Sequence, residues 1–223
     1  RGKRVRIGIA RPGIMAILEV AARPCHKLSS TDLGFVLGPR LNAAGRLDDM
    51  SLGIECLLTE DEHIARQIAA RLDALNLERR EIESSMKDEA EKALEAFISQ
   101  GNELPSGVVL YQSDFHQGVI GILAGRLKEK YYRPTIVFAQ QDAESIKGSA
   151  RSVPGVHIRD LLETVNTQNP GLIDKFGGHA MAAGLSLKIA RLSEFKLAFE
   201  AAVAEAIKGL PTQNLILSDG TLG

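Results

Sequence analysis

Residues that could bind an anion gather in several short segments of this 223-residue sequence. In Phe176–Gly184, a histidine, His179, directly follows Gly177 and Gly178. Glycine permits positive φ and lets a ligand approach main-chain N–H groups, which then form a concavity suited to phosphate. The imidazole can donate to a phosphate oxygen or relay a proton. This pattern predicts a phosphate-binding loop, with a structural turn beside a packed histidine as the alternative.

The segment Lys147–Ser152 predicts a second loop of this kind, after an apolar run. Gly148 opens the backbone there, and the hydroxyls of Ser149 and Ser152 can donate hydrogen bonds. Arg151 offers a planar set of donors that matches phosphate oxygens. A polar hairpin edge with a solvated arginine is the alternative for such a segment.

The segment Gly38–Arg46 is a third candidate, because Arg40, Asn42 and Arg46 lie among small residues that predict a tight loop. Such a loop can direct both guanidinium groups at one phosphate or at neighbouring phosphates. A helix C-terminus capped by Gly45 is the alternative, since arginine is favoured at the negative end of the helix dipole.

His116 and Gln117 lie between a predicted strand, Val108–Tyr111, and a predicted helix, Gly118–Lys130. Ligands of α/β folds bind at the carboxyl ends of strands and against helix N-termini, so both side chains are well placed for binding. A capping or packing role is the alternative for His116. The remaining histidines have no such neighbouring motif and are predicted to be structural or surface residues: His26, His63 and His157.

Composition indicates a globular chain, with 44% apolar and 25% charged residues. No apolar run is long enough to cross a membrane. The two cysteines lack the spacing of metal ligands, and we expect the protein to be located in the reducing cytoplasm. The net charge is −1, yet residues 1–46 carry nine basic against two acidic residues, a net +7, whereas residues 47–100 carry six against fourteen, a net −8. This segregation favours a focused basic groove for a polyanion.

The pattern of elements changes along the chain. Residues Asp61–Ser99 contain no glycine or proline and have helical spacing, which predicts one long helix connecting two lobes. After residue 101, short β-branched runs alternate with helical segments, as in an α/β layer. No cluster of Asp and His with the spacing of a two-metal phosphoesterase occurs in the sequence, and no nucleotide-binding loop or serine triad is present.

Four motifs, in order along nearly the whole chain, closely resemble the bacterial single-stranded-DNA-specific exonucleases of the DHH/DHHA1 phosphoesterase family: GPRLNAAGRLDDM, HQGVIGILAGRLKEKYYRP, KGSARS and FGGHAMAAGLSL. The resemblance implies the end of a DHH domain over residues 1–58, an interdomain helix over 59–100, a DHHA1 domain over 101–210 and the start of an OB-like domain over 211–223. The implied fold is a mixed α/β sheet flanked by helices, preceded by a mostly helical part.

The resemblance also implies an activity. Family members hydrolyse phosphodiester bonds from the 5′ end of single-stranded DNA in repair and recombination, using manganese or magnesium held by Asp and His of a DHH motif. That motif is absent from this sequence. We therefore expect a substrate-binding part that holds no metal by itself and is inactive alone. The expected partners are 5′-phosphorylated single-stranded DNA, the DHH catalytic part and a single-stranded-DNA-binding protein.

The resemblance also implies roles for the residues of this chain that match the family's motifs. Ser149 and Arg151 match the residues that grip the 5′ phosphate, assisted by Arg40 or Arg46. The Gly178–His179 pair matches a motif that faces the metal centre and holds the scissile phosphate or nucleotide. The predicted site has His179 as its catalytic residue, and Arg40, Asn42, Arg46, His116, Gln117, Gly148, Ser149, Arg151, Ser152, Gly177 and Gly178 as substrate-binding residues.

Two alternatives remain at the level of sequence. A related DHH/DHHA1 phosphoesterase that acts on short oligonucleotides or cyclic dinucleotides would share the Gly-Gly-His motif. A non-catalytic nucleic-acid-binding module would need no catalytic half. A DHH motif upstream of Arg1 would favour the nuclease over the binding module.

Overall fold

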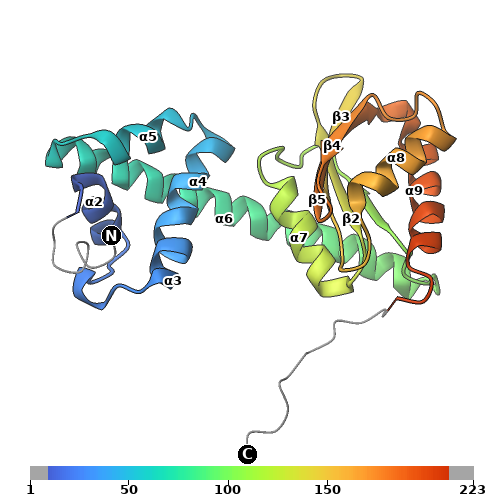
Figure 1. Cartoon of the computed structure of the whole chain (residues 1–223), viewed down its shortest axis with the longest axis horizontal. Coiled ribbons are helices and arrows are strands. Elements are labelled where there is room, and N and C mark those ends of the chain that lie inside the picture. The colour runs from blue at the N-terminus through green and yellow to red at the C-terminus, as the bar shows by residue number, and fades with distance from the viewer. Residues whose placement is uncertain (1–9, 211–223) are drawn as a thin grey trace, which may run out of the picture. The chain divides into compact units, whose positions relative to one another are not determined.

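The computed structural model describes residues 10–210. The chain divides into two compact units, with the division between Ser84 and Ser85, inside the long helix α6 (Glu62–Ser99) (Figure 1). This helix confirms the prediction of one long helix, and its 38 residues run without a break. The segment 211–223, expected to open a further domain, lies outside the described residues.

The first unit is helical. Helices α2 (Pro12–Val20), α4 (Gly38–Leu47) and α5 (Ser51–Leu58) bury their apolar faces together with the N-terminal half of α6. Ile17 and Leu72 are fully buried in this core. Short helical segments connect α2 to α4, namely η1 (Cys25–Lys27), α3 (Ser30–Asp32) and η2 (Leu33–Leu37).

The loop predicted over residues 38–46 is wrong, because these residues form α4. Proline is compatible with the first turn of a helix, where its missing N–H has no intrahelical partner. Ala43 and Ala44 are fully buried, and this packing offsets the low helix propensity of the glycines. The alternative, the C-terminal part of a helix with an arginine in its last turn, is confirmed, but its cap is wrong, since α4 continues to Leu47 and its C-cap residue is Asp48.

The second unit contains a five-stranded mixed sheet with the order β1-β2-β3-β5-β4. Only β1 and β2 are parallel, and the other neighbours are antiparallel. The strands are β1 (Val108–Tyr111), β2 (Thr135–Gln140), β3 (Ser145–Arg151), β4 (Lys175–Gly178) and β5 (Ala182–Lys188). With its flanking helices, this sheet confirms the predicted α/β fold class.

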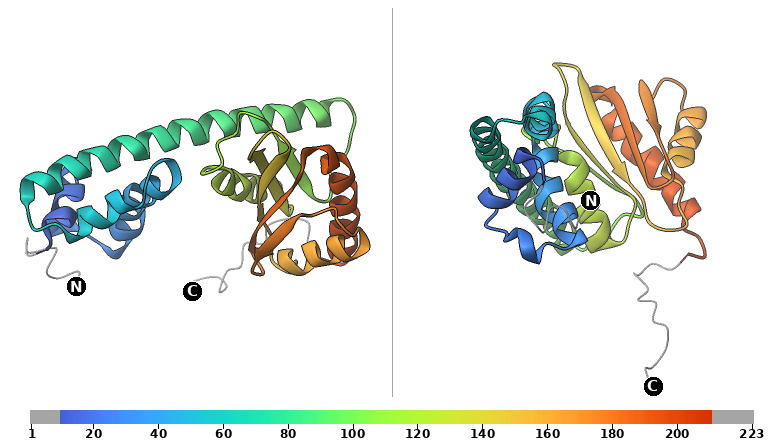
Figure 2. Two further views of the ribbon diagram at one scale, coloured as in Figure 1. Left: turned by 90° about the horizontal axis from the view of Figure 1, so that it is seen from above. Right: turned by 60° about the vertical axis from the view of Figure 1, so that its left-hand side comes forward.

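Helices cover the two faces of the sheet differently (Figure 2). Helices α8 (Ile158–Gln168) and α9 (Leu192–Ala206), the latter preceded by η3 (Ile189–Arg191), pack on one face over a core that includes Phe138. On the opposite face, α7 (Ile120–Tyr131) packs on β2 and β3. One face of the sheet therefore packs against two helices over a large apolar core, and the other face packs against α7.

The second predicted loop, Lys147–Ser152, is also wrong, because residues 145–151 form a strand between β2 and β5. Gly148 faces the core, where an added Cβ would lie 2.5 Å from Phe138 Cε1 and 2.8 Å from Leu185 Cδ2. The glycine is thus required by packing from neighbours distant in sequence. The loop predicted in Phe176–Gly184 is also mostly strand, because β4 ends at Gly178 and β5 begins at Ala182.

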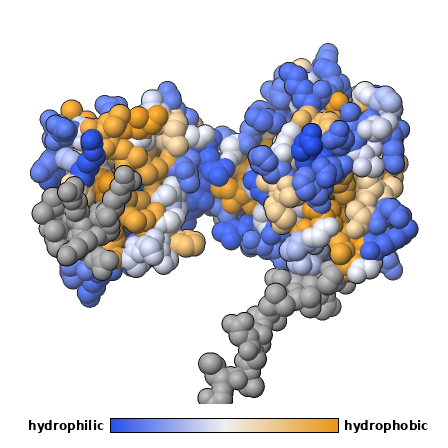
Figure 3. Space-filling view, viewed as in Figure 1, coloured by the Kyte–Doolittle hydropathy of each residue, from blue (hydrophilic) through white to orange (hydrophobic). Residues whose placement is uncertain are grey.

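The exposed surfaces of the two units are mixed in character (Figure 3). In this view hydrophilic residues surround hydrophobic patches, and the exposed large apolar side chains of the first unit include Ile54 and Leu58. Among residues 10–210, no helix combines the length and the apolar composition that crossing a membrane requires.

Candidate functional site

Alternation along β3 sorts the candidate residues between the two faces of the sheet. Ile146, Gly148 and Ala150 are buried, whereas Ser149 and Arg151 lie on the opposite face and are partly exposed. Side chains alternate between faces with a period of two, so Ser149 and Arg151 are brought together while Gly148 is separated from them. Gly148 therefore contributes packing beneath the site and no direct contact at it.

Ser149 and Arg151 lie against the start of α7. The guanidinium Nη1 of Arg151 donates to Ser149 Oγ at 3.0 Å and to Ala150 O at 2.8 Å. A Cβ added to Gly121, in the first turn of α7, would lie 3.0 Å from both Arg151 Nη2 and Ser149 Oγ. A guanidinium, a hydroxyl and the positive end of a helix dipole thus converge, which is chemistry suited to a phosphate.

Beside the Ser149 and Arg151 side chains, the same face of the sheet continues over β5 and β4, where it carries glycines. Ser149 pairs with Gly184, and Gly184 pairs in turn with Gly177, so the three residues form a row on one face. A Cβ added to Gly177 would meet nothing within 4 Å. The row leaves backbone accessible at Gly177, which lies in strand β4 and not in the predicted loop.

A second row on the same face is basic and was missed by sequence reasoning. Lys147 pairs with Ser186, and Ser186 pairs with Lys175, so two exposed lysines flank a hydroxyl. Together with the glycine row they line a shallow depression of about 280 Å³. The period-two spacing of Lys147, Ser149 and Arg151 was the signal that could have identified this face, had the segment been read as a strand.

His179 begins the turn between β4 and β5 and is exposed. Its N–H donates to Ala182 O at 2.8 Å. Gly178 before it has φ +153°, and an added Cβ would lie 2.4 Å from Ala182 O, so the tight turn itself requires this glycine. The geometry of the turn alone therefore explains why residue 178 is a glycine. The imidazole of His179 lies at the surface.

Ser152 is fully buried and supports this turn from below. Its N–H donates to Met181 O at 3.1 Å, and its hydroxyl donates to Val156 O at 2.7 Å. The N–H of Ile158 donates to Ala180 O at 2.9 Å. The observed contacts of Ser152 therefore fix the turn that carries His179, and its buried hydroxyl is not exposed to a substrate.

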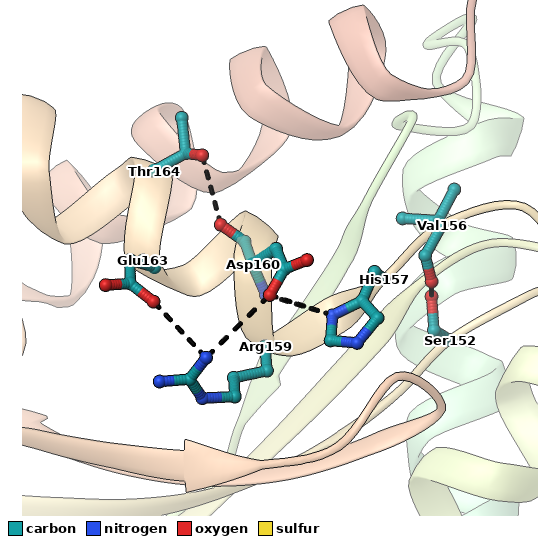
Figure 4. A network of polar contacts seen from close by, with 7 residues as sticks. All are labelled: Ser152, Val156, His157, Arg159, Asp160, Glu163 and Thr164. Carbon is teal, nitrogen blue, oxygen red and sulfur yellow. Dashed lines mark hydrogen bonds and ion pairs between the residues drawn. The ribbon is translucent and has the colours of Figure 1, made fainter.

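Further hydrogen bonds and ion pairs fix the start of α8 (Figure 4). His157 Nδ1 accepts from Asp160 N at 3.3 Å and lies 3.1 Å from Asp160 Oδ1. Arg159 pairs with Glu163 at 3.4 Å, and Thr164 Oγ1 donates to Asp160 O at 3.0 Å. His157 is the N-cap residue of α8, which confirms its structural role.

His116 and Gln117 form the entry to α7 and are both exposed. The Nδ1 atom of His116 accepts from Gly118 N at 3.1 Å, and Gln117 Nε2 donates to Gln140 O at 2.7 Å. The Gln117 contact attaches the entry turn to the end of β2, and the His116 contact lies within the turn. The observed contacts thus correspond to the capping alternative for His116 and set the direction in which α7 begins.

In the first unit, Arg40 and Arg46 differ in their surroundings. Arg40 Nε lies 2.7 Å from Asp73 Oδ1 on α6, and its Nη1 donates to Val36 O at 3.0 Å. The Arg40 side chain is only 16% exposed, so it holds α4 against α6. Arg46 and Asn42 are exposed on α4.

Arg79 of α6 was also missed by sequence reasoning. Its Nη1 lies 2.7 Å from Glu83 Oε2, its Nη2 donates to Asn76 Oδ1 at 2.7 Å, and its side chain is 14% exposed. Burial lowers the pKa of the Arg79 guanidinium, Glu83 opposes that shift, and the charges of Arg46 and Arg80 add to it. Arg46 and Arg80 are thus close enough to act on the charge of Arg79.

The described residues do not supply a donor set for the divalent metal that the resemblance implies. Within residues 10–210, no three His, Cys, Asp or Glu side chains are grouped closely enough to hold a metal ion. Mg²⁺ and Mn²⁺ prefer several oxygen or imidazole ligands together. The arrangement described here can bind and orient an anion, and no chemical step through a metal is derived from it.

Comparison with known proteins identifies the second unit. A family model described as the DHHA1 domain matches residues 105–205. The chain is 51% identical over 219 residues to the single-stranded-DNA-specific exonuclease RecJ of Dickeya dadantii and 50% identical to that of Escherichia coli. Each match covers 98% of this chain and 38% of the relative, so the chain spans well under half of these proteins.

Solved structures agree with this assignment. RecJ of Thermus thermophilus in complex with Mg²⁺ superimposes with a TM-score of 0.75 at 27% identity, covering 90% of this chain and 30% of that one. An exonuclease RecJ bound to manganese gives a TM-score of 0.74 at 26% identity over 95% of this chain and 50% of that one. The motif resemblance is thereby confirmed, and the chain is a DHHA1-containing portion of the RecJ family of single-stranded-DNA-specific exonucleases.

Proposed function

We propose that this chain is the substrate-holding part of a 5′–3′ exonuclease that hydrolyses phosphodiester bonds of single-stranded DNA in repair and recombination. One observation carries the proposal: Arg151 and Ser149 converge on the first turn of α7, beside an open sheet face floored by glycine. Relatives that match 98% of the chain are named as single-stranded-DNA-specific exonucleases.

In this proposal the 5′-terminal phosphate binds Arg151, Ser149 and the N–H groups at the start of α7. A guanidinium provides two parallel donors, and a terminal phosphate carries more charge than an internal one, so the pocket prefers a strand end. The following nucleotides cross the face that carries Gly184 and Gly177. Lys147 and Lys175 neutralise the phosphates there.

Of the two arginines of α4, we propose Arg46 as the phosphate contact. The side chain of Arg40 is only 16% exposed and contacts Asp73 and Val36 O, whereas Arg46 is exposed on α4. Asn42, one turn earlier on α4, contacts the same strand. His179 is proposed to face the scissile phosphate from its turn, and His116 and Gln117 to hold the α7 entry in place.

The remaining expectations are also proposals. Manganese or magnesium would be held by a DHH catalytic part, as the metals named in the related structures suggest. A single-stranded-DNA-binding protein is the proposed partner besides that part and the DNA. The two free cysteines, Cys25 and Cys56, are consistent with the expected cytoplasmic location.

The direct test is equilibrium binding of the chain to a short fluorescent single strand that ends in a 5′ phosphate. The 5′-hydroxyl strand, the blunt duplex and a cyclic dinucleotide serve as comparisons. We expect about tenfold tighter binding of the phosphorylated strand than of the hydroxyl strand, since one charge-assisted contact contributes roughly 1.5 kcal/mol or more. Preferred binding of the cyclic dinucleotide would favour the alternative phosphoesterase and contradict the proposal.

A further inference from the structure

A group of hydrogen bonds joins the carboxyl ends of β1 and β2, outside the contacts described for the phosphate site. The two strands are parallel, so their last residues, Tyr111 and Gln140, lie at the same end of the sheet. The Tyr111 hydroxyl donates to Gln140 Oε1, and Gln140 Nε2 donates to the carbonyl of Asp142 in the turn between β2 and β3. Both polar ends of this half-buried amide side chain are therefore occupied, which fixes its orientation.

The backbone of Gln140 holds the entry to α7. Its carbonyl accepts a hydrogen bond from Gln117 Nε2 at 2.7 Å. In the register of the sheet, Gln140 pairs with Ile146 of β3, the strand that also carries the two side-chain donors of the proposed phosphate site. One residue thus connects β1, the turn between β2 and β3, strand β3 and the entry to the helix.

The entry to α7 is close to the phosphate site along the chain. Gln117 precedes Gly121 by four residues. The N–H groups of Val119 and Ile120 donate to His116 O at 2.9 and 3.2 Å, which closes the turn at the start of the helix. A Cβ added to Gly121 would lie 3.0 Å from the guanidinium and from the hydroxyl of the proposed site. A small displacement of the entry would therefore change how these donors meet a phosphate.

Apolar packing alone does not specify the position of this first turn. Helix α7 buries an apolar face made of Ile120, Leu123, Ala124 and Leu127. Burial of apolar area is non-directional, whereas a hydrogen bond depends on the distance and angle between its atoms. The apolar face therefore holds α7 on the sheet, and the directional contacts of its entry define where the first turn lies.

We propose that Gln140 is a positioning residue, whose hydrogen bonds set the distance between the start of α7 and the Arg151 and Ser149 side chains. In this way Gln140 determines the preference for a 5′ phosphate without touching the DNA. The inference rests on the proposed function, because it concerns the same phosphate site. A purely structural role of Gln140, in closing the end of the sheet, would affect stability and leave the preference unchanged.

The test measures the affinity ratio between 5′-phosphorylated and 5′-hydroxyl single strands, together with urea unfolding of each variant. Gln140→Leu removes both polar ends of the amide with little change in volume, and Tyr111→Phe removes only the hydroxyl. We expect the ratio to fall about fivefold in Gln140→Leu and about threefold in Tyr111→Phe, as the loss of neutral hydrogen bonds predicts. The double variant should match Gln140→Leu, because both changes act through the same contacts.

Two control variants separate positioning from stability. Gln168→Leu makes the same change on α8, which covers the opposite face of the sheet, and should leave the ratio unchanged. Asn169→Ala removes the hydrogen bond from Asn169 Nδ2 to Val165 O, at 2.9 Å, and should lower stability without changing the ratio. A wild-type preference that persists in Gln140→Leu would overturn this inference and leave the proposed function standing. A wild-type ratio near one would overturn both.

Discussion

Gly121 determines how closely Arg151 and Ser149 approach the start of α7. An added Cβ would lie 3.0 Å from Arg151 Nη2 and from Ser149 Oγ, so it would displace both groups by a few tenths of an ångström. Gly125, one turn later in the same helix, has nothing within 4 Å of the equivalent position. The two glycines therefore allow the same substitution to be made with and without contact to the proposed phosphate site.

We predict that Gly121→Ala lowers the preference for a 5′ phosphate while the fold is retained. Gly125→Ala should raise the free energy of unfolding by about 1 kcal/mol, the difference in helix propensity, and leave the preference unchanged. Chemical denaturation and binding of phosphorylated and hydroxyl strands measure the two effects. Equal preferences in both variants would show that Gly121 is a helix residue without a role in binding.

At the scale of elements, Arg40 attaches α4 to α6 in the first unit through Asp73 and Val36 O. Arg40→Ala leaves a partly buried acceptor without its donor, and we predict a loss of about 2 kcal/mol in the free energy of unfolding of that unit. Arg71→Ala is the matched control, because its ion pair with Asp48 is exposed on both sides and should cost less than about 1 kcal/mol. Comparable losses in both variants, measured by urea unfolding, would contradict this assignment.

Elements differ in how far the sequence could predict them. Helix α6 follows from local properties, since no glycine or proline interrupts its apolar periodicity. Helix α4 and strand β3 were predicted as loops because they are rich in small residues, and their structure depends on non-local packing. Gly148 is explained only by Phe138 and Leu185, which come from other strands. Arg151 and Ser149 could be found by residue type, whereas the basic row on the sheet required the strand register.

At the scale of the whole molecule, binding and catalysis are proposed to be separate functions of a longer protein. The chain spans 38% of the relatives' length, and its described residues provide anion-binding groups without a metal-binding cluster. We predict that the isolated chain releases no nucleotides from 5′-phosphorylated single-stranded DNA in manganese or magnesium. Metal-dependent turnover, retained after repurification and lost in His179→Ala, would contradict this prediction.

The central claim is that Arg151 reads the 5′ end, and Arg151→Ala tests it most directly. Arg159→Ala is the matched control, because Arg159 lies in the same unit on α8, which covers the opposite face of the sheet. We predict that Arg151→Ala reduces the affinity ratio between 5′-phosphorylated and 5′-hydroxyl single strands about tenfold, with a smaller change in affinity for the hydroxyl strand, and that Arg159→Ala leaves the ratio unchanged. Equal losses for both strand ends in Arg151→Ala would contradict the account.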